Sequence, residues 1–413
     1  MNLLWLKSEL LHPIDKGGKI RTYQTLRFLK ERHRVTYLTL DDGQAAPDAA
    51  ARAHEYCHDL VRVPFAPPAR GTPGFFADLA RNLASSLPYA VARYRSAAMT
   101  EAIARVIREQ ATDLVVCDFL VPAVNLPRQP GVPTLLFQHN VEAAIWERHA
   151  RVATNPVARR YFRVQWQRMR AFERDACRRF DHVVAVSEED ATVFREAYGV
   201  PSVTAVATGV DLDFFRPSGT VPPRPHHLAF TGSMDWMPNV DGIRWFVKEV
   251  LPLVRQAVPA VSLSIVGRKP AAAVQALADP AAGIVVTGTV PDIRPYLEEA
   301  AVVVVPLRVG GGTRLKIYEA MAMERPIVAT TVGAEGLPVQ DGATIRIADD
   351  PPAFAAAIVA LLHDAAQAGH LGRAGADLVR ARFGWAQVNE QFDEACRQAV
   401  ATGRRAGRPG RAA

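Results

Sequence analysis

The sequence predicts an α/β protein built from two doubly wound parallel sheets. Strand-like runs of β-branched residues alternate with helix-like periods along the chain, which is typical of parallel sheets with helices on both faces. The 413 residues exceed the comfortable size of one hydrophobic core. A stretch rich in proline, glycine and aspartate at 208–225 separates the strand runs into two series. We therefore expect two α/β domains joined by a linker.

The elements follow in order from this division. The first domain, 1–207, has predicted strands at 3–6, 35–40, 114–117, 134–137, 182–186 and 202–206. After the linker at 208–225, the second domain, 226–383, has predicted strands at 227–231, 262–266, 284–286, 302–305, 327–329 and 344–347. Residues 384–401 have helical character and could cross back to the first domain. Residues 402–413 carry four arginines and no acid, and we expect a disordered basic tail there.

Composition limits the class of protein. The hydrophobic fraction of 49% and the charged fraction of 22% are those of an ordinary globular protein. The four cysteines are far apart and form no C-x-x-C pair, so neither a zinc site nor a disulfide framework is indicated. No apolar run approaches the roughly 18 residues that span a bilayer, and the run at 3–6 is too short for a signal peptide. These features favour a cytoplasmic protein.

The basic charge is unevenly distributed. The net charge is +7, and residues 148–179 hold ten arginines against Glu173 and Asp175, a local balance of +8. This segment, with the amphipathic stretch 75–91, could place the protein at the inner face of an anionic cell membrane or attract a phosphate-bearing acceptor. A solvated helix face explains the arginine-rich segment equally well, and a buried helix face explains the amphipathic stretch equally well. No nucleic-acid-binding motif accompanies the charge, so we expect no nucleic-acid partner.

The most informative motif is V-G-G-G-T-R-L-K-I-Y-E at 309–319, which follows a run of four valines. A strand, a glycine loop and a helix start form an anion site, because free N–H groups and the positive end of the helix dipole point out of the first turn. Thr313 is a suitable N-cap, and Arg314 and Lys316 add positive charge. Glu319 could accept hydrogen bonds from two adjacent hydroxyls. Together they would suit a diphosphate joined to a ribose, although surface charge pairs on an ordinary helix remain an alternative.

Two loops of the first domain follow predicted strands in the same way. One carries Gly17 and Gly18 before a predicted helix, and the other is Q-H-N-V-E at 138–142. Ligands of such sheets bind outside the carboxyl ends of the strands. The loops of the two domains could therefore face each other across a cleft.

The chain resembles the GT-B glycosyltransferases of family GT4, the group 1 glycosyltransferases. The resemblance is strongest at F-T-G-S-M-D-W-M-P-N (230–239), S-I-V-G (264–267), T-G-T-V-P-D-I-R-P-Y (287–296) and from the glycine motif to P-I-V-A-T-T-V-G-A-E-G-L (326–337). The first half supports it through D-K-G-G-K-I-R (15–21), Q-H-N-V-E (138–142), V-S-E-E-D (186–190) and T-G-V-D-L-D-F-F (208–215). The resemblance implies two Rossmann-like domains, with the nucleotide-sugar held mainly by the second and the acceptor mainly by the first.

The signature glutamates of this family are only partly present. Glu319 matches the second glutamate of the E-x7-E signature, which implies that it binds the ribose hydroxyls. Gly311 stands where the first glutamate would be, so backbone N–H groups would have to take over its contact with the sugar. The loop at 232–235 also lacks the basic residue that many relatives carry there. We expect Arg314 and Lys316 to replace it on the diphosphate, with surface pairing to acids such as Glu324 as the alternative.

These considerations give a full set of expected site residues. We expect Arg314, Lys316 and His139 to be catalytic and Glu142 to contact the acceptor. The expected donor-binding residues are Gly17, Gly18, Gly232, Gly311, Gly312, Thr313 and Glu319. Preorganised cations and N–H donors at the leaving diphosphate would be the largest catalytic effect. No metal or other cofactor is expected, and the D-x-D at 211–213 is better explained as a turn.

The resemblance implies transfer of a sugar from a nucleotide-sugar with retention of anomeric configuration, the leaving phosphate accepting the acceptor's proton. A saccharide or a lipid-linked saccharide is the expected acceptor, in the synthesis of cell-surface polysaccharide or glycoconjugate. Two alternatives stay open. A UDP-sugar epimerase of the same fold would need no acceptor, and the missing first glutamate would fit an inactive nucleotide-sugar-binding subunit.

Overall fold

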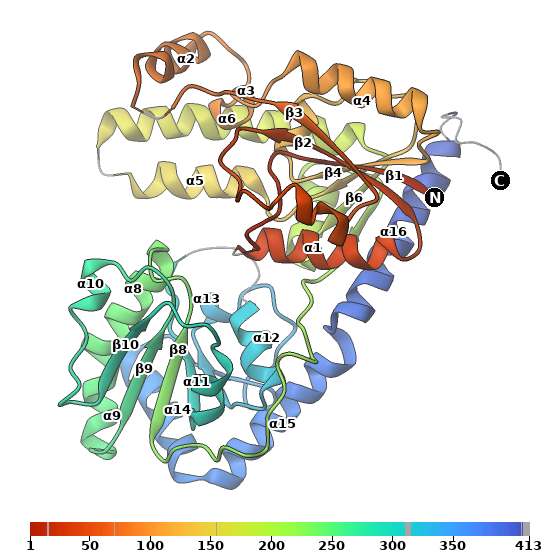
Figure 1. The fold of residues 1–413 in the computed structure, drawn as a ribbon. Coiled ribbons are helices and arrows are strands. Elements are labelled where there is room, and N and C mark those ends of the chain that lie inside the picture. The colour runs from red at the N-terminus through yellow and green to blue at the C-terminus, as the bar shows by residue number, and fades with distance from the viewer. Residues whose placement is uncertain (15, 70, 154, 310–314, 406, 408–413) are drawn as a thin grey trace. The chain divides into compact units, whose positions relative to one another are not determined.

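The computed structural model describes residues 1–14, 16–69, 71–153, 155–309, 315–405 and 407. By its internal contacts the chain divides into two units, drawn in Figure 1. Unit 1 comprises Met1–Ala207 and the C-terminal segment from Val388, and unit 2 comprises Thr208–Gln387. Each unit contains one parallel sheet. The prediction of two doubly wound parallel sheets is therefore confirmed.

The sheet of unit 1 has seven strands in the order β3-β2-β1-β4-β5-β6-β7, all parallel. The strands are β1 (Asn2–Lys7), β2 (Arg34–Asp41), β3 (Asp59–Pro64), β4 (Leu114–Asp118), β5 (Thr134–Phe137), β6 (His182–Ala185) and β7 (Val203–Ala205). Its helices are α1 (Gly17–Lys30), α2 (Pro73–Leu83), α3 (Tyr89–Ala92), α4 (Ala97–Glu109), α5 (Glu142–Val152), α6 (Pro156–Arg179), α7 (Glu188–Thr192) and most of α16 (Trp385–Arg405). Short 3-10 turns lie at Ala51–Glu55 and Val121–Val124, and a π-helical turn lies at Val193–Ala197.

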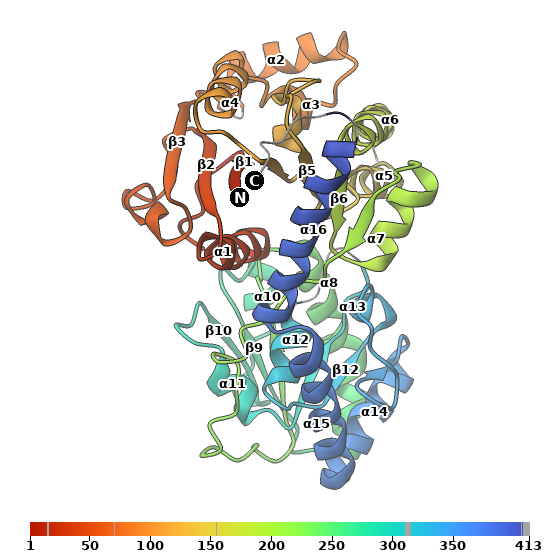
Figure 2. The same cartoon turned by 90° about the vertical axis from the view of Figure 1, so that its right-hand side faces the viewer.

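The two faces of this sheet bury alternate side chains of each strand. On one face, Leu4 and Leu6 of β1 pack with residues of α4 and α6. On the other face, Trp5 of β1 and Phe137 of β5 contact Phe392 of α16, with ring centroids 5.8 Å and 4.7 Å apart. Figure 2 shows α16 running along this side of the sheet. Burial of each such side chain is worth roughly 1.5–3 kcal/mol, so α16 belongs to the core of unit 1.

Unit 2 has six parallel strands in the order β10-β9-β8-β11-β12-β13. They are β8 (His227–Thr231), β9 (Ser262–Val266), β10 (Ile284–Gly288), β11 (Val302–Val305), β12 (Ile327–Ala329) and β13 (Arg346–Ile347). The helices are α8 (Met237–Trp245), α9 (Leu251–Ala257), α10 (Ala272–Gln275), α11 (Arg294–Glu299), α12 (Leu315–Ala322), α13 (Thr331–Ala334), α14 (Pro351–His363) and α15 (Ala365–Arg382), with a π-helical turn at Phe246–Val250. One core joins the central strands to α8, α9 and α14.

Three features differ from the sequence-based expectation. Strand β3 was not predicted, because it is an edge strand in which only Val63 is buried, so it lacks an apolar run. Helix α1 begins at Gly17, so Gly17 and Gly18 form its first turn and do not precede it. Residues 402–405, expected in a disordered tail, continue α16, because Gly403 packs so closely on Pro133 that an added Cβ would lie 2.8 Å from its ring.

In the described part of the chain, no single helix is long and apolar enough to cross a membrane. Helices α14 and α15 of the described chain pass this test of length and composition when they are taken together, but they bend by 105° at the break between them.

Candidate active site

The carboxyl end of β8 in unit 2 brings Lys316 against a glycine. A Cβ added to Gly232 would lie 2.7 Å from Lys316 Nζ and 2.7 Å from Asn239 Nδ2, so a larger residue would displace one of them. The Lys316 ammonium donates to Asn239 Oδ1 at 2.8 Å and lies 4.4 Å from the centre of the Phe230 ring. The glycine therefore allows a helix-borne cation to reach the end of a central strand, where ligands of parallel sheets bind.

Glu319 lies three residues after Lys316 in α12, on the neighbouring turn of the same helix. Burial raises the pKa of its carboxyl to about 7, and the positive charge of Lys316 opposes part of that rise. The side chain keeps some accessible surface. Among the described residues, none donates a hydrogen bond to the carboxylate.

Three of the expected donor-binding residues and one expected catalytic residue lie outside the described residues. They are Gly311, Gly312, Thr313 and Arg314. The expected N-cap, the expected guanidinium and the replacement of the first signature glutamate by backbone N–H groups therefore stay predictions. Two cations, Arg314 and Lys316, are expected at the diphosphate, and of these Lys316 lies within the described residues.

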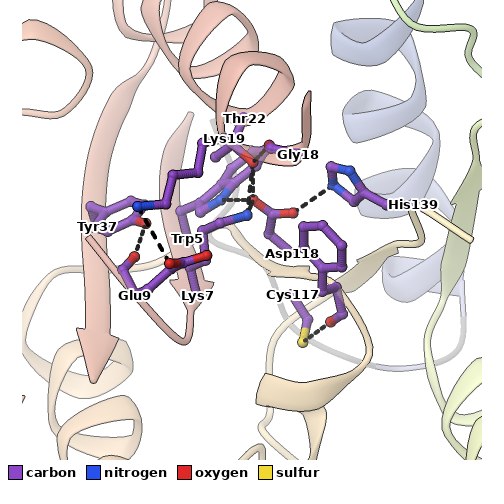
Figure 3. A network of polar contacts seen from close by, with 11 residues as sticks. Trp5, Lys7, Glu9, Gly18, Lys19, Thr22, Tyr37, Cys117, Asp118 and His139 are labelled. Carbon is purple, nitrogen blue, oxygen red and sulfur yellow. Dashed lines mark hydrogen bonds and ion pairs between the residues drawn. The ribbon is translucent and has the colours of Figure 1, made fainter. Parts of the chain in front are cut away.

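A second group of polar residues lies at the carboxyl ends of β1, β4 and β5 in unit 1, with Asp118 at its centre. The carboxylate is fully buried, and Figure 3 shows the donors that converge on it. Oδ2 accepts from Trp5 Nε1 at 3.0 Å, Lys7 Nζ at 2.8 Å and Thr22 Oγ1 at 2.6 Å. Oδ1 pairs with His139 Nε2 at 2.8 Å. Burial alone would raise the pKa of Asp118, but the charge of Lys7 and the pairing with His139 bring it below its usual value, so the group is a carboxylate.

His139 follows β5 and is held by aromatic rings. Its imidazole stacks on Phe119 with centroids 3.8 Å apart and planes inclined by 8°, and Phe137 lies 4.3 Å away on centroids. Burial lowers the pKa of His139 to about 4, although the Asp118 carboxylate opposes the shift. The imidazole is therefore neutral at pH 7. Gly18 of α1 lies next to it, because a Cβ added to Gly18 would be 3.9 Å from His139 Nδ1.

Gly18 of α1 is required by close packing. A Cβ at Gly18 would lie 2.8 Å from the Phe119 ring, so a larger residue would push that ring off His139. Gly17 and Gly18 form the first turn of α1, where backbone N–H groups have no partner within the helix. The structure thus brings three expected residues, Gly17, Gly18 and His139, to one edge of the unit 1 sheet.

Glu142 is the first residue of α5, and burial raises the pKa of its carboxyl. The start of α5 is fixed by Glu173 of α6, whose buried carboxylate accepts from Glu142 N at 2.7 Å and Ala143 N at 3.0 Å. Tyr198 OH and Gln138 Nε2 also donate to Glu173, at 2.8 Å and 3.1 Å. Glu173 thereby ties the Q-H-N-V-E loop to α6.

Sequence reasoning missed Asp118, Lys7 and Glu173 as parts of the site. Asp118 did carry a signal, since an acid directly after the predicted strand at 114–117 falls at the ligand-binding edge of a parallel sheet. Lys7 ends β1 in the same way. Glu173 carried none, because an acid within an arginine-rich helix is expected on a solvated face.

A pocket of ≈ 290 Å³ opens beside the Asp118 group in unit 1, at the carboxyl ends of β1 and β2. Its polar lining includes three acids, Glu9, Asp41 and Asp42, and two lysines, Lys16 and Lys19. Such a mixture of donors and acceptors suits a ligand with several hydroxyl groups.

The expected turn at the D-x-D is confirmed, because Asp211 Oδ1 accepts from the backbone N–H groups of Asp213 and Phe214 at 3.2 Å and 2.9 Å. Across the residues whose positions are described, no three His, Cys, Asp or Glu side chains are grouped as ligands of a metal.

Comparison with known proteins identifies the family. Residues 16–214 match the family described as Glycosyltransferase Family 4, and residues 225–364 match the one described as Glycosyl transferases group 1. The chain belongs to the group 1 glycosyltransferases of family 4. An uncharacterized 44.6 kDa protein in the cps region of Klebsiella pneumoniae is 22% identical over 187 residues, which cover 44% of this chain and 47% of that protein. The match thus spans about half of the relative's length.

Solved structures with the same fold cover nearly the whole chain. Sucrose-phosphate synthase from Thermosynechococcus elongatus has a TM-score of 0.68 at 18% identity, covering 97% of this chain and 99% of that one. HepE from Anabaena in complex with UDP and glucose has a TM-score of 0.64 at 15% identity, covering 95% and 98%. The two Rossmann-like domains of the GT-B fold are therefore confirmed.

Proposed function

We propose that this glycosyltransferase moves a sugar from a nucleotide-sugar to a saccharide or lipid-linked saccharide with retention of anomeric configuration, in the synthesis of cell-surface polysaccharide or glycoconjugate. The observation that carries the proposal is the Glu319 carboxylate, which accepts no hydrogen bond from a described residue and lies on the same helix as Lys316. A carboxylate accepts two hydrogen bonds from a pair of ribose hydroxyls, and an ammonium binds a phosphate. That a protein of the same fold was solved with UDP and glucose supports this class of donor.

In this mechanism, Lys316 stabilises the negative charge that develops on the leaving diphosphate. Gly232 provides the room for its ammonium at the end of β8. The leaving phosphate takes the proton of the acceptor hydroxyl, so no carboxylate nucleophile is needed. His139 in unit 1 contacts a substrate hydroxyl, and Glu142 contributes to the acceptor side.

The acceptor is expected in unit 1. The mixed lining of the ≈ 290 Å³ pocket supports a saccharide, since its acids and lysines supply acceptors and donors for several hydroxyls. A lipid-linked acceptor would also require contact with a membrane surface. The exposed apolar residues of α2, Phe76 and Leu83, support that requirement.

The direct test combines a donor screen with two variants. Purified protein is first screened for thermal stabilisation by UDP-, GDP-, ADP- and dTDP-sugars. Transfer from the stabilising donor is then measured for wild type, Glu319→Ala and Lys316→Ala. We expect each variant to keep its fold and to lose at least about 10²-fold in kcat/KM. Glu324→Ala, which removes an acid of the same region that pairs with Arg380 on the surface, is the matched control.

Wild-type turnover in either variant would refute the assignment of these residues. Incubation of wild type with the nucleotide-sugar alone separates the alternatives. An epimerised sugar would indicate an epimerase, and donor binding without transfer to any acceptor would indicate a binding subunit.

A further inference from the structure

The two oxygens of the Asp118 carboxylate have different hydrogen-bond partners. Three donors, Trp5, Lys7 and Thr22, contact Oδ2, whereas His139 is the one described residue that pairs with Oδ1. A buried ion pair such as Lys7–Asp118 adds little net stability, because removal of both charges from water offsets most of their attraction. The arrangement is better explained by its effect on His139.

The pairing with Oδ1 determines which nitrogen of His139 carries the proton. A carboxylate has no hydrogen to donate, so Nε2 must be the donor across the 2.8 Å contact. The imidazole is neutral, and Nδ1 therefore carries a lone pair. No described residue donates a hydrogen bond to Nδ1.

The aromatic contacts keep this nitrogen in place. Phe119 stacks on the imidazole at 3.8 Å, and the bare backbone of Gly18 lets that stack form beside the first turn of α1. Lys7 Nζ lies 4.4 Å from the centre of the same Phe119 ring, so the ion pair and the stack share one framework. Rotation of the His139 imidazole would break both its stack on Phe119 and its contact with Asp118.

We propose that Asp118 is a positioning residue that holds His139 in its Nε2–H form and so presents Nδ1 as a hydrogen-bond acceptor to a hydroxyl group of the sugar substrate beside Gly18. This inference rests on the proposed function. The inference adds two points to the proposed function: the hydrogen bond runs from the substrate hydroxyl to His139, and Asp118 sets that direction.

Asp118→Asn is the critical variant, because the surrounding donors fix how the new amide must lie. Trp5, Lys7 and Thr22 need an oxygen at the Oδ2 position, so the amide NH2 must face His139. His139 can then pair only through a lone pair on Nε2, and its proton moves to Nδ1. The variant thus exchanges the acceptor at Nδ1 for a donor with little change of shape.

Nitrogen NMR of protein labelled with 15N-histidine reads the tautomer directly. The His139 signals are assigned by their loss in His139→Gln. We expect Nε2–H in wild type at pH 7 and Nδ1–H in Asp118→Asn. Thr22→Val, which removes one donor from Oδ2 and leaves Oδ1 unchanged, is the matched control and should keep Nε2–H. An Nδ1–H signal in wild type overturns the inference even if Asp118→Asn fails to fold.

Transfer kinetics supply the second readout. Asp118→Asn should lose about 10- to 100-fold in kcat/KM, the effect of one hydrogen bond within a site, and Thr22→Val much less. In a panel of monodeoxy donors and acceptors, the analogue that lacks the contacted hydroxyl should be used equally well by wild type and Asp118→Asn. Unchanged turnover in Asp118→Asn with a switched tautomer refutes the inference alone. Absence of transfer by wild type refutes the proposed function instead.

Discussion

Glu319 combines two properties that are unfavourable in a folded protein unless a ligand uses them. Its carboxyl is buried enough to raise its pKa to about 7, and no described residue compensates by donating a hydrogen bond. Residues of this kind cluster at functional sites, where stability is lost in exchange for binding. The sequence identified Glu319 through its place in a family signature, and the structure adds the physical cost.

We predict that Glu319→Gln stabilises the free protein at pH 8 by about 1–2 kcal/mol, with little effect at pH 4.5. The folded pKa lies above the ordinary 4.5. The favourable contribution of the carboxyl is therefore present below pH 4.5 and is lost as the pH rises through 7, whereas glutamine has no such loss. Urea unfolding at both pH values measures the difference. Equal stabilisation at pH 4.5 and pH 8 would contradict the assigned pKa.

The contact between Asp118 and His139 is only partly evident from the sequence. The sequence placed His139 in a loop after a strand and matched it to a family position. The partner 21 residues earlier in the chain was not predicted, because only the pairing of β4 with β5 brings the two strand ends together.

The first element of functional interest is the start of α5, which carries Glu142. Its first N–H groups are satisfied by Glu173, which lies on α6 and not in the preceding loop. A cap supplied from another helix cannot be recognised from local sequence, since cap motifs are read within a few residues. Glu173 therefore links α5, α6 and the Q-H-N-V-E loop through four donors.

We predict that Glu173→Ala lowers the free energy of unfolding by about 2–4 kcal/mol, because it leaves four donors, three of them in buried hydrogen bonds, without their acceptor. Denaturant unfolding followed by circular dichroism provides the measurement. Glu147→Ala, on the same α5 but half-exposed and ion-paired with Arg151, is the control and should change stability by less than about 0.5 kcal/mol. A loss no larger than the control would show that the Glu173 contacts contribute no net stability.

The second element of functional interest is α2. Arg168 of α6 donates to the carbonyl groups of Asn82 and Leu83 at 2.8 Å each, which satisfies the end of α2. At least one arginine of the basic segment is thus used within the protein. On α2, Phe76 and Leu83 remain 57% and 63% exposed, and their spacing of seven residues places them on one side of the helix.

If the acceptor is lipid-linked, these two side chains are expected to enter the membrane surface. We predict that wild type floats with vesicles containing anionic lipid and that the double variant Phe76→Asp, Leu83→Asp loses most of this binding. Val221→Asp, which adds a charge at another exposed apolar residue, is the control. Failure of wild type to float at low salt would remove the membrane contact from the proposal.

At the scale of the whole molecule, the C-terminal helix belongs to the core of the N-terminal unit. From Val388 onwards α16 is part of unit 1, although almost 400 residues separate it from β1. Phe392 packs on Trp5 and Phe137, and Asn389 Oδ1 accepts from Thr25 Oγ1 at 3.1 Å. His33 and Asp393 add a contact of 2.7 Å.

We predict that truncation after Gln387 destabilises unit 1 by several kcal/mol, because it exposes Trp5 and Phe137, each worth roughly 1.5–3 kcal/mol when buried. Unfolding by urea, followed by tryptophan fluorescence, measures the loss. Truncation after Arg405 retains the packed helix and should unfold as the full chain does. Equal stability of the two truncated forms would show that α16 is not needed by the core.

The local sequence pattern identifies the class of fold and most of the strands, because buried parallel strands are short runs of apolar residues. It also located the glycine motif and the family signature, since these are contiguous. Three features emerge only when the chain is folded: Asp118 pairs with His139, Glu173 caps α5, and α16 packs in the core of unit 1. Each of these depends on contacts between residues far apart in the chain, and such contacts leave no periodic pattern in the sequence because burial and pairing arise only when the sheet assembles.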